Sequence, residues 1–267
     1  MPQMPFHSDQ TAVPPRCKCC GRVVALLGRI DFNRSCLDRI GTRVFPPSHR
    51  LLPYWRCEDC GFIFTDQMDA WSAEDFKREI YNDDYIKVDP PIPGRSDVPA
   101  RQTPAYQAGR HIASFFGGGQ NAIRILDFGA GGDPGPTGLA LIDQGFTVQS
   151  HDPYRSDVCV TEDSRYDLII AIEVLEHCND LRDVQRFMQT HLADGGLLWI
   201  QTLLHPHPAP PDILSSWYIA PRNGHISIFS FVSLHLLFRQ VGINIVQTPF
   251  ATIGFRTLPK FPNTVFV

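Results

Sequence analysis

Long apolar runs are missing from this sequence of 267 residues. The stretches Leu168 to Ile172 and Leu197 to Ile200 fall far short of the roughly 18 residues that a membrane helix needs. The N-terminal segment MPQMPFHSDQ contains neither the basic part nor the apolar part of a secretory signal. We therefore expect a soluble cytoplasmic protein without a membrane partner.

Positive charge is not in excess either, since 24 Lys and Arg residues stand against 28 Asp and Glu residues, a net charge of −4. A chain of this charge has no overall positive field that attracts nucleic acid. Its hydrophobic fraction of 43% excludes a disordered chain. The sequence contains neither a G-x-S-x-G nucleophile turn nor a Walker-type phosphate loop, so neither chemistry is expected. The length suits one α/β domain plus a small module.

Charge and cysteine are unevenly distributed along the chain. The net charge is +4 for residues 1–60, −3 for residues 61–118 and −5 for residues 119–267. Most cysteines also lie in the first of these three segments, namely Cys17, Cys19, Cys20, Cys36, Cys57 and Cys60. The chain therefore begins with a basic, cysteine-rich module, to which we assign residues 1–70.

Two C-x-x-C-G knuckles lie in this module, well separated along the chain. Zinc prefers four soft ligands at tetrahedral corners, and C-x-x-C followed by glycine presents two thiolates from one tight turn. Two disulfides are the alternative, but we do not expect them without a secretory signal. A thioredoxin-like motif would open a βαβ unit, and neither knuckle does so. We expect one structural zinc site formed by Cys17, Cys20, Cys57 and Cys60.

The ligand choice in the first knuckle is less constrained, because Cys19 lies beside Cys20. His49 is an alternative ligand, although the prolines before it indicate a plain loop. Aromatic and β-branched residues from Leu51 to Thr65 predict a hairpin around the second knuckle, as in a zinc ribbon. The expected role of the ribbon is to cover one flank of the next domain, and docking of a partner is the alternative.

Residues 71–104 are predicted to contain a short helix and a proline-rich linker or lid. Ser72 precedes Asp75 at the spacing of a capping box, which predicts a helix start. Five prolines between Asp89 and Pro104 favour extended chain. A second helix is expected from about Ala105, stopped by the glycines after Phe116.

From Ile123 onward, short apolar strands alternate with helical segments. The run Ile123 to Phe128 leads into a glycine-rich turn at residues 129–135, and a helix and a second strand ending at Asp152 follow. This order is that of a nucleotide-binding βαβ unit, in which glycines let a ligand approach the backbone and the carboxylate accepts ribose hydroxyls. Because NAD dehydrogenases use the same glycine loop and acidic residue, the loop alone does not identify the ligand.

Four segments, in order and spacing, resemble the class I S-adenosylmethionine-dependent methyltransferases: ILDFGAGGDPG, HDPY, YDLIIAIEVLEH and GGLLWIQTLL. The resemblance covers residues 105–267. It implies a Rossmann-like, doubly wound α/β fold with a seven-stranded mixed sheet, closed by a hairpin of residues 244–248 and 264–267. It also implies S-adenosylmethionine as cofactor, bound by Asp127, Gly129, Gly131, Gly135, Asp152 and Glu173.

The sequence departs from that family in two places. Three residues lie between Gly131 and Gly135 where the family usually has one, so we interpret Gly132 and Asp133 as an insertion. The segment from Asp152 to Tyr166 is also short, because the family usually has a helix and a strand with an acidic end there. Asp163 is then the candidate for contact with adenine.

The catalytic candidates are Glu173, Glu176 and His177, which follow the fourth strand, and His225 in a distal loop. Ligands of doubly wound folds bind at the carboxyl edge of the sheet, where this strand ends. In one interpretation Glu173 contacts the cofactor while Glu176 and His177 orient the turn. In the other, which resembles the metal site of ubiquinone-pathway and small-RNA methyltransferases, all four bind a divalent cation such as Mg or Mn. His225 is expected to act as base or ligand in either case.

We therefore expect a methyltransferase that moves the methyl group of S-adenosylmethionine to a hydroxyl, amine or carbon of a small molecule. One alternative is a divalent-metal-dependent RNA 2′-O-methyltransferase, which the −5 charge of residues 119–267 argues against. The other is a non-catalytic scaffold that docks a partner through its zinc ribbon. The sequence leaves the acceptor and the oligomeric state open.

Overall fold

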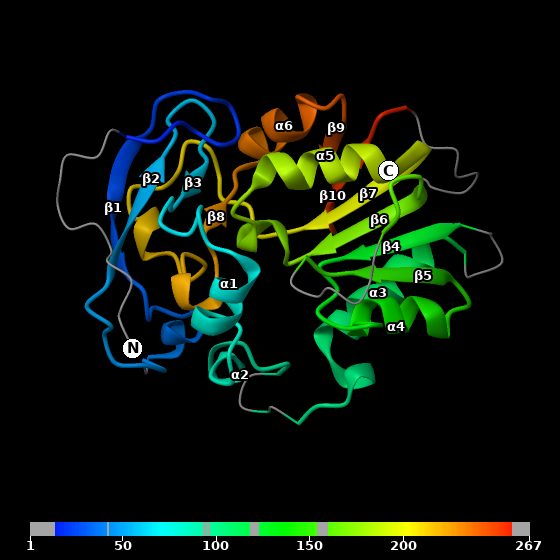
Figure 1. Ribbon diagram of the computed structural model, residues 1–267, viewed down its shortest axis with the longest axis horizontal. Helices are drawn as coiled ribbons and strands as arrows, with labels where there is room; N and C mark the ends of the chain where they lie inside the picture. The colour runs from blue at the N-terminus through cyan, green and yellow to red at the C-terminus, as the bar shows by residue number, and fades with distance from the viewer. Residues whose placement is uncertain are drawn as a thin grey trace.

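The computed structural model describes residues 14–41, 43–92, 95, 97–117, 123–153 and 160–257. Figure 1 shows a smaller sheet on the left of the molecule and a larger one on the right. Within the described residues, no helix is long and apolar enough to cross a membrane.

The larger sheet has four neighbouring parallel strands, followed at one edge by one strand antiparallel to them and then by an edge strand that again runs in their direction. In spatial order the strands are β5 (Thr147–His151), β4 (Arg124–Phe128), β6 (Tyr166–Ile172), β7 (Leu192–Gln201), β10 (Thr252–Phe255) and β9 (Asn244–Gln247). This is the expected mixed α/β sheet.

The described part of the chain forms six strands in this sheet, one fewer than the seven that the family resemblance implies. The physical reason lies between Asp152 and Tyr166, where the chain is too short for both a crossover helix and a further parallel strand. At the other edge β9 pairs with β10. Residues 264–267, which we expected to form the closing hairpin with β9, lie outside the described residues.

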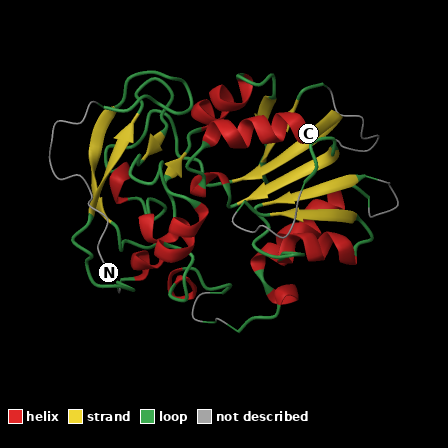
Figure 2. Ribbon diagram, viewed as in Figure 1, coloured by secondary structure: helices red, strands yellow, loops and turns green. Residues whose placement is uncertain are grey.

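Helices cover both faces of this sheet (Figures 1 and 2). Side chains alternate along β6, so Leu168 and Ile170 enter the core on one face and Ile169 and Ala171 enter the core on the other. The first core includes residues of α3, and the second includes residues of α5 and α6. The helices are α3 (Pro104–Phe115), α4 (Pro136–Asp143), α5 (Leu181–His191) and α6 (Phe231–Arg239).

The smaller sheet is antiparallel and takes its last strand from far along the chain. Its order is β1 (Ala25–Asp31), β2 (Leu51–Arg56), β3 (Ile63–Phe64) and β8 (Ser227–Ile228). The pairing of Ile63 with Ile228 joins the cysteine-rich module to the C-terminal half through the main chain. The boundaries at residues 70 and 104 stay predictions.

Apolar side chains of three distant segments share the core beside this sheet. Tyr54 comes from the module, Phe76 and Ile80 from the linker, and Ile213 and Ile226 from the C-terminal half. The linker forms two short helices, and Ser72 and Asp75 make the expected capping box. The short elements are α1 (Ala73–Glu79), α2 (Tyr85–Val88), η1 (Cys36–Ile40), η2 (Ala100–Gln102), η3 (Leu175–His177), η4 (Ile213–Ser215) and η5 (Pro221–Asn223).

Candidate active site

The structure brings four cysteine side chains of the module together. The Sγ atoms of Cys17, Cys20, Cys57 and Cys60 all lie within 4.8 Å of one another. The Sγ atoms of Cys17 and Cys60, and those of Cys20 and Cys57, are 3.5 Å apart, far longer than the about 2.05 Å of a disulfide, so the thiols are free. Cys19 is buried but is not part of this group. Four free sulfurs from two turns are the donor set that zinc prefers.

The two knuckles have the same backbone geometry. Gly21 and Gly61 lie in the left-handed region, with φ of +74° and +77°. Their amides donate to the carbonyls of Cys17 and Cys57, each at 2.8 Å. Glycine reaches this conformation without the Cβ penalty, which explains why each C-x-x-C ends in glycine.

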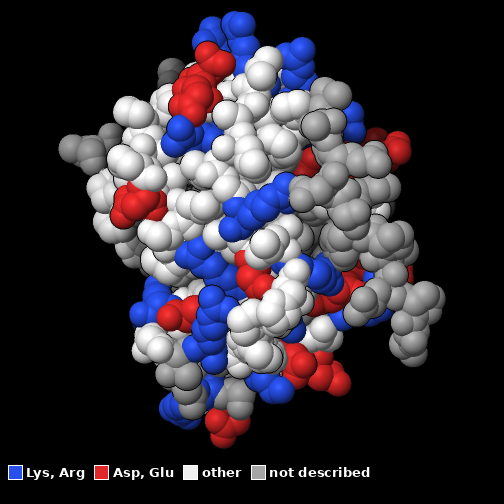
Figure 3. All heavy atoms as spheres, turned by 90° about the vertical axis from the view of Figure 1, so that its left-hand side faces the viewer, with Lys and Arg blue, Asp and Glu red and all other residues white. Residues whose placement is uncertain are grey.

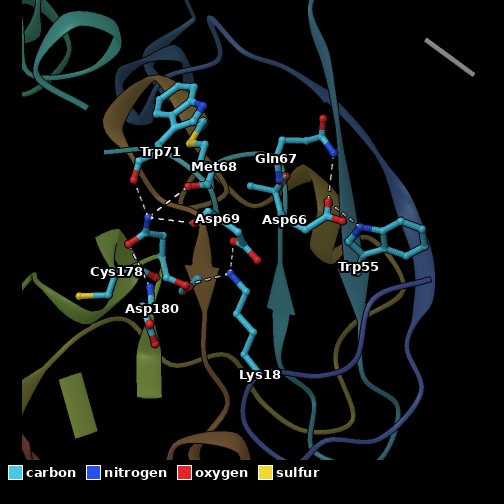
Figure 4. A network of polar contacts seen from close by, with 12 residues as sticks. Lys18, Trp55, Asp66, Gln67, Met68, Asp69, Trp71, Cys178 and Asp180 are labelled. Carbon is cyan, nitrogen blue, oxygen red and sulfur yellow. Dashed lines mark hydrogen bonds and ion pairs between the residues drawn. The ribbon is translucent and has the colours of Figure 1, made fainter. Parts of the chain in front are cut away.

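A polar network connects the first knuckle to the loop that follows β6 (Figure 4). Lys18, between two of the cysteines, forms an ion pair with Asp69 and donates a hydrogen bond to the carbonyl of Asn179 at 3.2 Å. The Asn179 side-chain amide donates to the carbonyls of Met68 and Trp71, both at 3.2 Å. The module therefore holds the chain two residues after His177.

The glycine-rich turn leaves the carboxyl end of β4 in a geometry that favours glycine at three points, since Gly131 also has a left-handed φ, of +63°. At Gly129, φ is +76°, and an added Cβ would lie 2.5 Å from the Val174 side chain. At Gly135 an added Cβ would lie 2.0 Å from the carbonyl oxygen of Ala130. At Gly131, in contrast, a Cβ would meet nothing within 4 Å, so the turn has open space in front of it.

Two carboxylates accept hydrogen bonds from backbone amides in this turn and in the helix that follows it. Asp127 is 4% exposed and accepts a hydrogen bond from the Gly138 amide at 3.1 Å. Burial raises the pKa of Asp127 to about 7. Asp152, at the end of β5, accepts a hydrogen bond from the Gly131 amide at 2.9 Å. The five predicted cofactor residues of β4, the turn and β5 thus lie together at one sheet edge, whereas Asp163 is exposed and outside the cavity described next.

A cavity of about 1120 Å³ opens in front of the turn. On the cofactor side it is lined by Gly129, Gly131 and Asp152, and by side chains of α5. It continues past Glu173 and His177 to His225. The opposite wall comes from the module and the linker: Cys36, Arg39, Trp71, Phe76, Tyr81, Tyr85 and Asp89.

The predicted catalytic residues meet at the inner end of this cavity. A carboxylate oxygen of Glu176 and ring nitrogens of His177 and His225 lie within 4.8 Å of one another, and Glu173 is outside this group. Glu176 is 0% exposed. The Tyr218 hydroxyl lies 2.6 Å from Glu176 Oε1 and 3.1 Å from Glu173 Oε2.

Two buried polar atoms of this group have no hydrogen-bond partner among the described residues, namely Glu176 Oε2 and His177 Nδ1. His225 Nδ1 lies 2.8 Å from the carbonyl oxygen of Tyr218. Because a carbonyl only accepts, Nδ1 of His225 carries the proton and Nε2 presents a lone pair. Orphaned buried atoms of this kind fit a bound cation or an acceptor group.

Burial determines the protonation of the site. It lowers the pKa of His177 to about 4 and that of His225 to about 3, so both imidazoles are neutral at pH 7. Burial, and then the charge of Glu176, raises the pKa of Glu173 to about 9. Glu173 also has φ of +51°, an uncommon conformation for a residue with a side chain, at the end of β6.

The wall opposite the sheet was not predicted. Cys36, which is not among the predicted zinc ligands, lies with its Sγ 3.7 Å from His225 Nδ1. Tyr81 and Tyr85 of the linker and Phe187 of α5 also line the cavity. The proline-rich composition favoured a lid, but no local pattern shows which aromatic side chains face a pocket.

Comparison with known proteins agrees with the sheet and the turn. Residues 100–248, a little more than half of the chain, match a family model described as a methyltransferase domain. The chain therefore belongs to the methyltransferase domain family, and it contains a class I S-adenosylmethionine-dependent methyltransferase domain. No curated protein matches the sequence.

Several solved structures are similar to part of this chain. The YcgJ protein of Bacillus subtilis is 15% identical with a TM-score of 0.39, covering 53% of this chain and 71% of its own. The mitomycin 7-O-methyltransferase MmcR is 16% identical with a TM-score of 0.39, covering 56% and 52%. Human N-acetylserotonin methyltransferase, solved with S-adenosylmethionine, is 12% identical with a TM-score of 0.41, covering 57% and 52%. The chain thus spans about half the length of the last two.

Proposed function

We propose that this protein transfers the methyl group of S-adenosylmethionine to an oxygen, nitrogen or carbon atom of a small molecule. The observation that carries the proposal is the continuous cavity that runs from the glycine turn to the Glu173, His177 and His225 side chains. A volume of about 1120 Å³ exceeds the roughly 300–1000 Å³ of common ligand sites, which suits a cofactor and an acceptor side by side.

The residues at the sheet edge fit the cofactor. Open space in front of Gly131 lets a ligand approach the backbone, and Asp152 is placed to accept ribose hydroxyls. Asp127 supports the turn from below, and Glu173 lines the cavity between the two ends. When bound, S-adenosylmethionine supplies a methyl group on a positively charged sulfur.

In this proposal Glu173 is the base that takes the proton from the acceptor. Its carboxyl group is exposed to the cavity, and its raised pKa means that the deprotonated form is a stronger base than an ordinary carboxylate. The low pKa of His225 supports a role as hydrogen-bond acceptor or ligand and not as a base at neutral pH. The aromatic wall excludes water and holds the acceptor in line, and such alignment lowers a barrier by roughly 7–11 kcal/mol.

A second candidate is methyl transfer assisted by a divalent cation. Glu176, His177 and His225 cluster within 4.8 Å, and two of their buried atoms are unpartnered within the described residues. Two neutral imidazoles with one carboxylate suit Zn better than Mg or Mn, which prefer oxygen ligands. Such an ion would lower the pKa of an acceptor hydroxyl. The test is manganese and zinc titration of the protein and of His177→Asn, in which a site would lose affinity.

We also propose that Cys17, Cys20, Cys57 and Cys60 bind one structural zinc ion. The four free sulfurs leave no open position for a substrate, as in closed structural sites. The site lies in the same apolar cluster as Phe62, Phe229 and Leu175, so the metal would stabilise the contact between module and methyltransferase domain.

An RNA acceptor is not favoured. On the module face in Figure 3, Lys and Arg side chains gather from the middle of the view to its lower part, with acidic side chains among them. Among the residues that line the cavity, five are acidic and two are basic. A groove that binds a polyanion such as RNA needs more basic than acidic side chains.

The experiment is methyl transfer from tritiated S-adenosylmethionine to pooled small metabolites and, in parallel, to total RNA. We expect label in the small-molecule fraction and at least tenfold less with Glu173→Gln. Glu162→Gln is the matched control, since Glu162 is exposed and outside the cavity. Label in RNA alone would overturn the proposal, and absence of cofactor binding would favour the non-catalytic scaffold.

A further inference from the structure

The cavity has an aromatic wall that leads from its inner end to its mouth. The Tyr218 ring lies 4.3 Å from the His225 ring, measured between centroids, and 5.3 Å from the Trp217 ring. Trp217 is 37% exposed. Tyr218 also touches Glu173 through its hydroxyl. The wall therefore begins at the reacting end and reaches solvent at Trp217.

A cation covers the outer end of this wall. The Arg39 guanidinium carbon lies 4.0 Å from the centroid of the Trp217 ring, and both residues line the cavity. Arg39 belongs to η1, whose first residue, Cys36, contacts His225. Three residues of such a helix rise about 6 Å, so η1 spans the distance from the inner end toward the mouth.

Within the described part of the chain, the Arg39 side chain has no anionic partner. It makes no ion pair and no side-chain hydrogen bond there, and Asp38 beside it is occupied by Ser35 and the Val44 amide. Stacking on an indole fixes the plane of the guanidinium while leaving its N–H groups free. A planar fork held in this way fits the oxygens of a carboxylate or a phosphate.

The charges of the cavity give a ligand one orientation. Glu173 lies at the inner end, with Glu176 behind it, and Asp152 lies on the cofactor side. The only basic residues among the described lining residues are Arg39 and Lys77, and Lys77 likewise has no ion pair with them. The inner end offers carboxyl groups and no Lys or Arg to an anionic group of the ligand, whereas Arg39 attracts it.

We propose that the acceptor carries a carboxylate or phosphate group that Arg39 binds at the mouth, while the acceptor body lies along Trp217 and Tyr218. This inference rests on the proposed function, because it defines the substrate class of that site. The length of the wall limits the separation between the anionic group and the methylated atom. The wall consists of three steps: 4.0 Å from the Arg39 guanidinium to the Trp217 ring, 5.3 Å to the Tyr218 ring and 4.3 Å to the His225 ring. The acceptor is therefore a small, elongated anion.

The test uses inorganic phosphate and benzoate as probes and the Nε–Hε signals of the arginines in the NMR spectrum of the labelled, full-length protein. At constant ionic strength, we expect the Arg39 signal to shift saturably with at least one probe. The tighter probe distinguishes phosphate from carboxylate. Arg239 is the matched control, because it is also exposed and without an ion pair to any described residue but does not line the cavity.

In the Arg39→Gln variant, the indole N–H signal of Trp217 reports on binding of the probe at the same site. The affinity for the probe should be at least tenfold weaker than in the wild type. Arg39→Lys should also lose binding of the probe, since an ammonium group neither stacks on the indole nor presents a planar pair of N–H donors. If Arg39 and Arg239 respond alike, only adventitious anion contact exists and the inference is wrong. Titration of S-adenosylmethionine into the same samples tests the proposed function separately, and its affinity should change less than threefold in Arg39→Gln.

Discussion

The placement of the third glycine of the cofactor turn can be tested by adding one methyl group. In Gly135→Ala the new Cβ would lie 2.0 Å from the Ala130 carbonyl oxygen, whereas an ordinary contact needs at least 3.4 Å. The turn must therefore open before the methyl group fits. The φ of Gly135, −71°, suits alanine, so the effect is steric and not a matter of backbone conformation. A displacement that relieves so short a contact should weaken S-adenosylmethionine binding about a hundredfold, or about 2.7 kcal/mol.

Gly132→Ala is the matched control in the same turn. There the nearest atom to an added Cβ, the Pro134 carbonyl oxygen, is 3.3 Å away, so the neighbour must yield only slightly. We expect its affinity, measured by calorimetric titration, to stay within threefold of the wild type. Equal effects of the two substitutions, or wild-type affinity of Gly135→Ala, would refute the assignment of Gly132 and Asp133 to an insertion.

Three further outcomes are expected. Because the raised pKa of Glu173 keeps it protonated at pH 7, kcat/KM should rise with pH toward about 9, and a Glu173→Gln variant that keeps this rise would remove Glu173 as the base. Asn179→Ala removes the hydrogen bonds to the Met68 and Trp71 carbonyls, of which the Met68 carbonyl still accepts from the Trp71 amide, and should lower stability by about 1–3 kcal/mol in thermal melts; an unchanged Tm would contradict the tether. Removing zinc by chelation, followed by metal analysis, should lower Tm and abolish methyl transfer, whereas full activity of metal-free protein would show that the cysteines serve another purpose.

The parts of the site that sequence could predict are those in which neighbours along the chain determine geometry. Knuckle spacing brings Cys17 and Cys20 together, and a strand followed by glycines brings Gly129 and Gly131 to a sheet edge. Asp152 follows from the next strand. Each of these features depends on a short stretch of local sequence, so periodicity and turn chemistry suffice.

The part of the acceptor side that comes from the module and the linker could not be predicted, because it depends on contacts between distant segments. The pairing of β3 with β8 and the hydrogen bond from the Tyr54 hydroxyl to the His225 carbonyl, at 2.9 Å, join residues far apart in sequence. Nothing near Cys36 or Arg39 indicates that η1 faces a cavity. The expectation of seven strands came from the family resemblance, and the described residues form six of them.

The central claim is that the sheet edge binds S-adenosylmethionine, and calorimetric titration of the zinc-loaded protein tests it most directly. Asp152→Asn is compared with Asp163→Asn, in which an exposed carboxylate outside the cavity is changed. The account predicts micromolar affinity for the wild type and for Asp163→Asn, and at least tenfold weaker binding for Asp152→Asn. Absence of binding to the wild type, or equal affinity of the two variants, would contradict it.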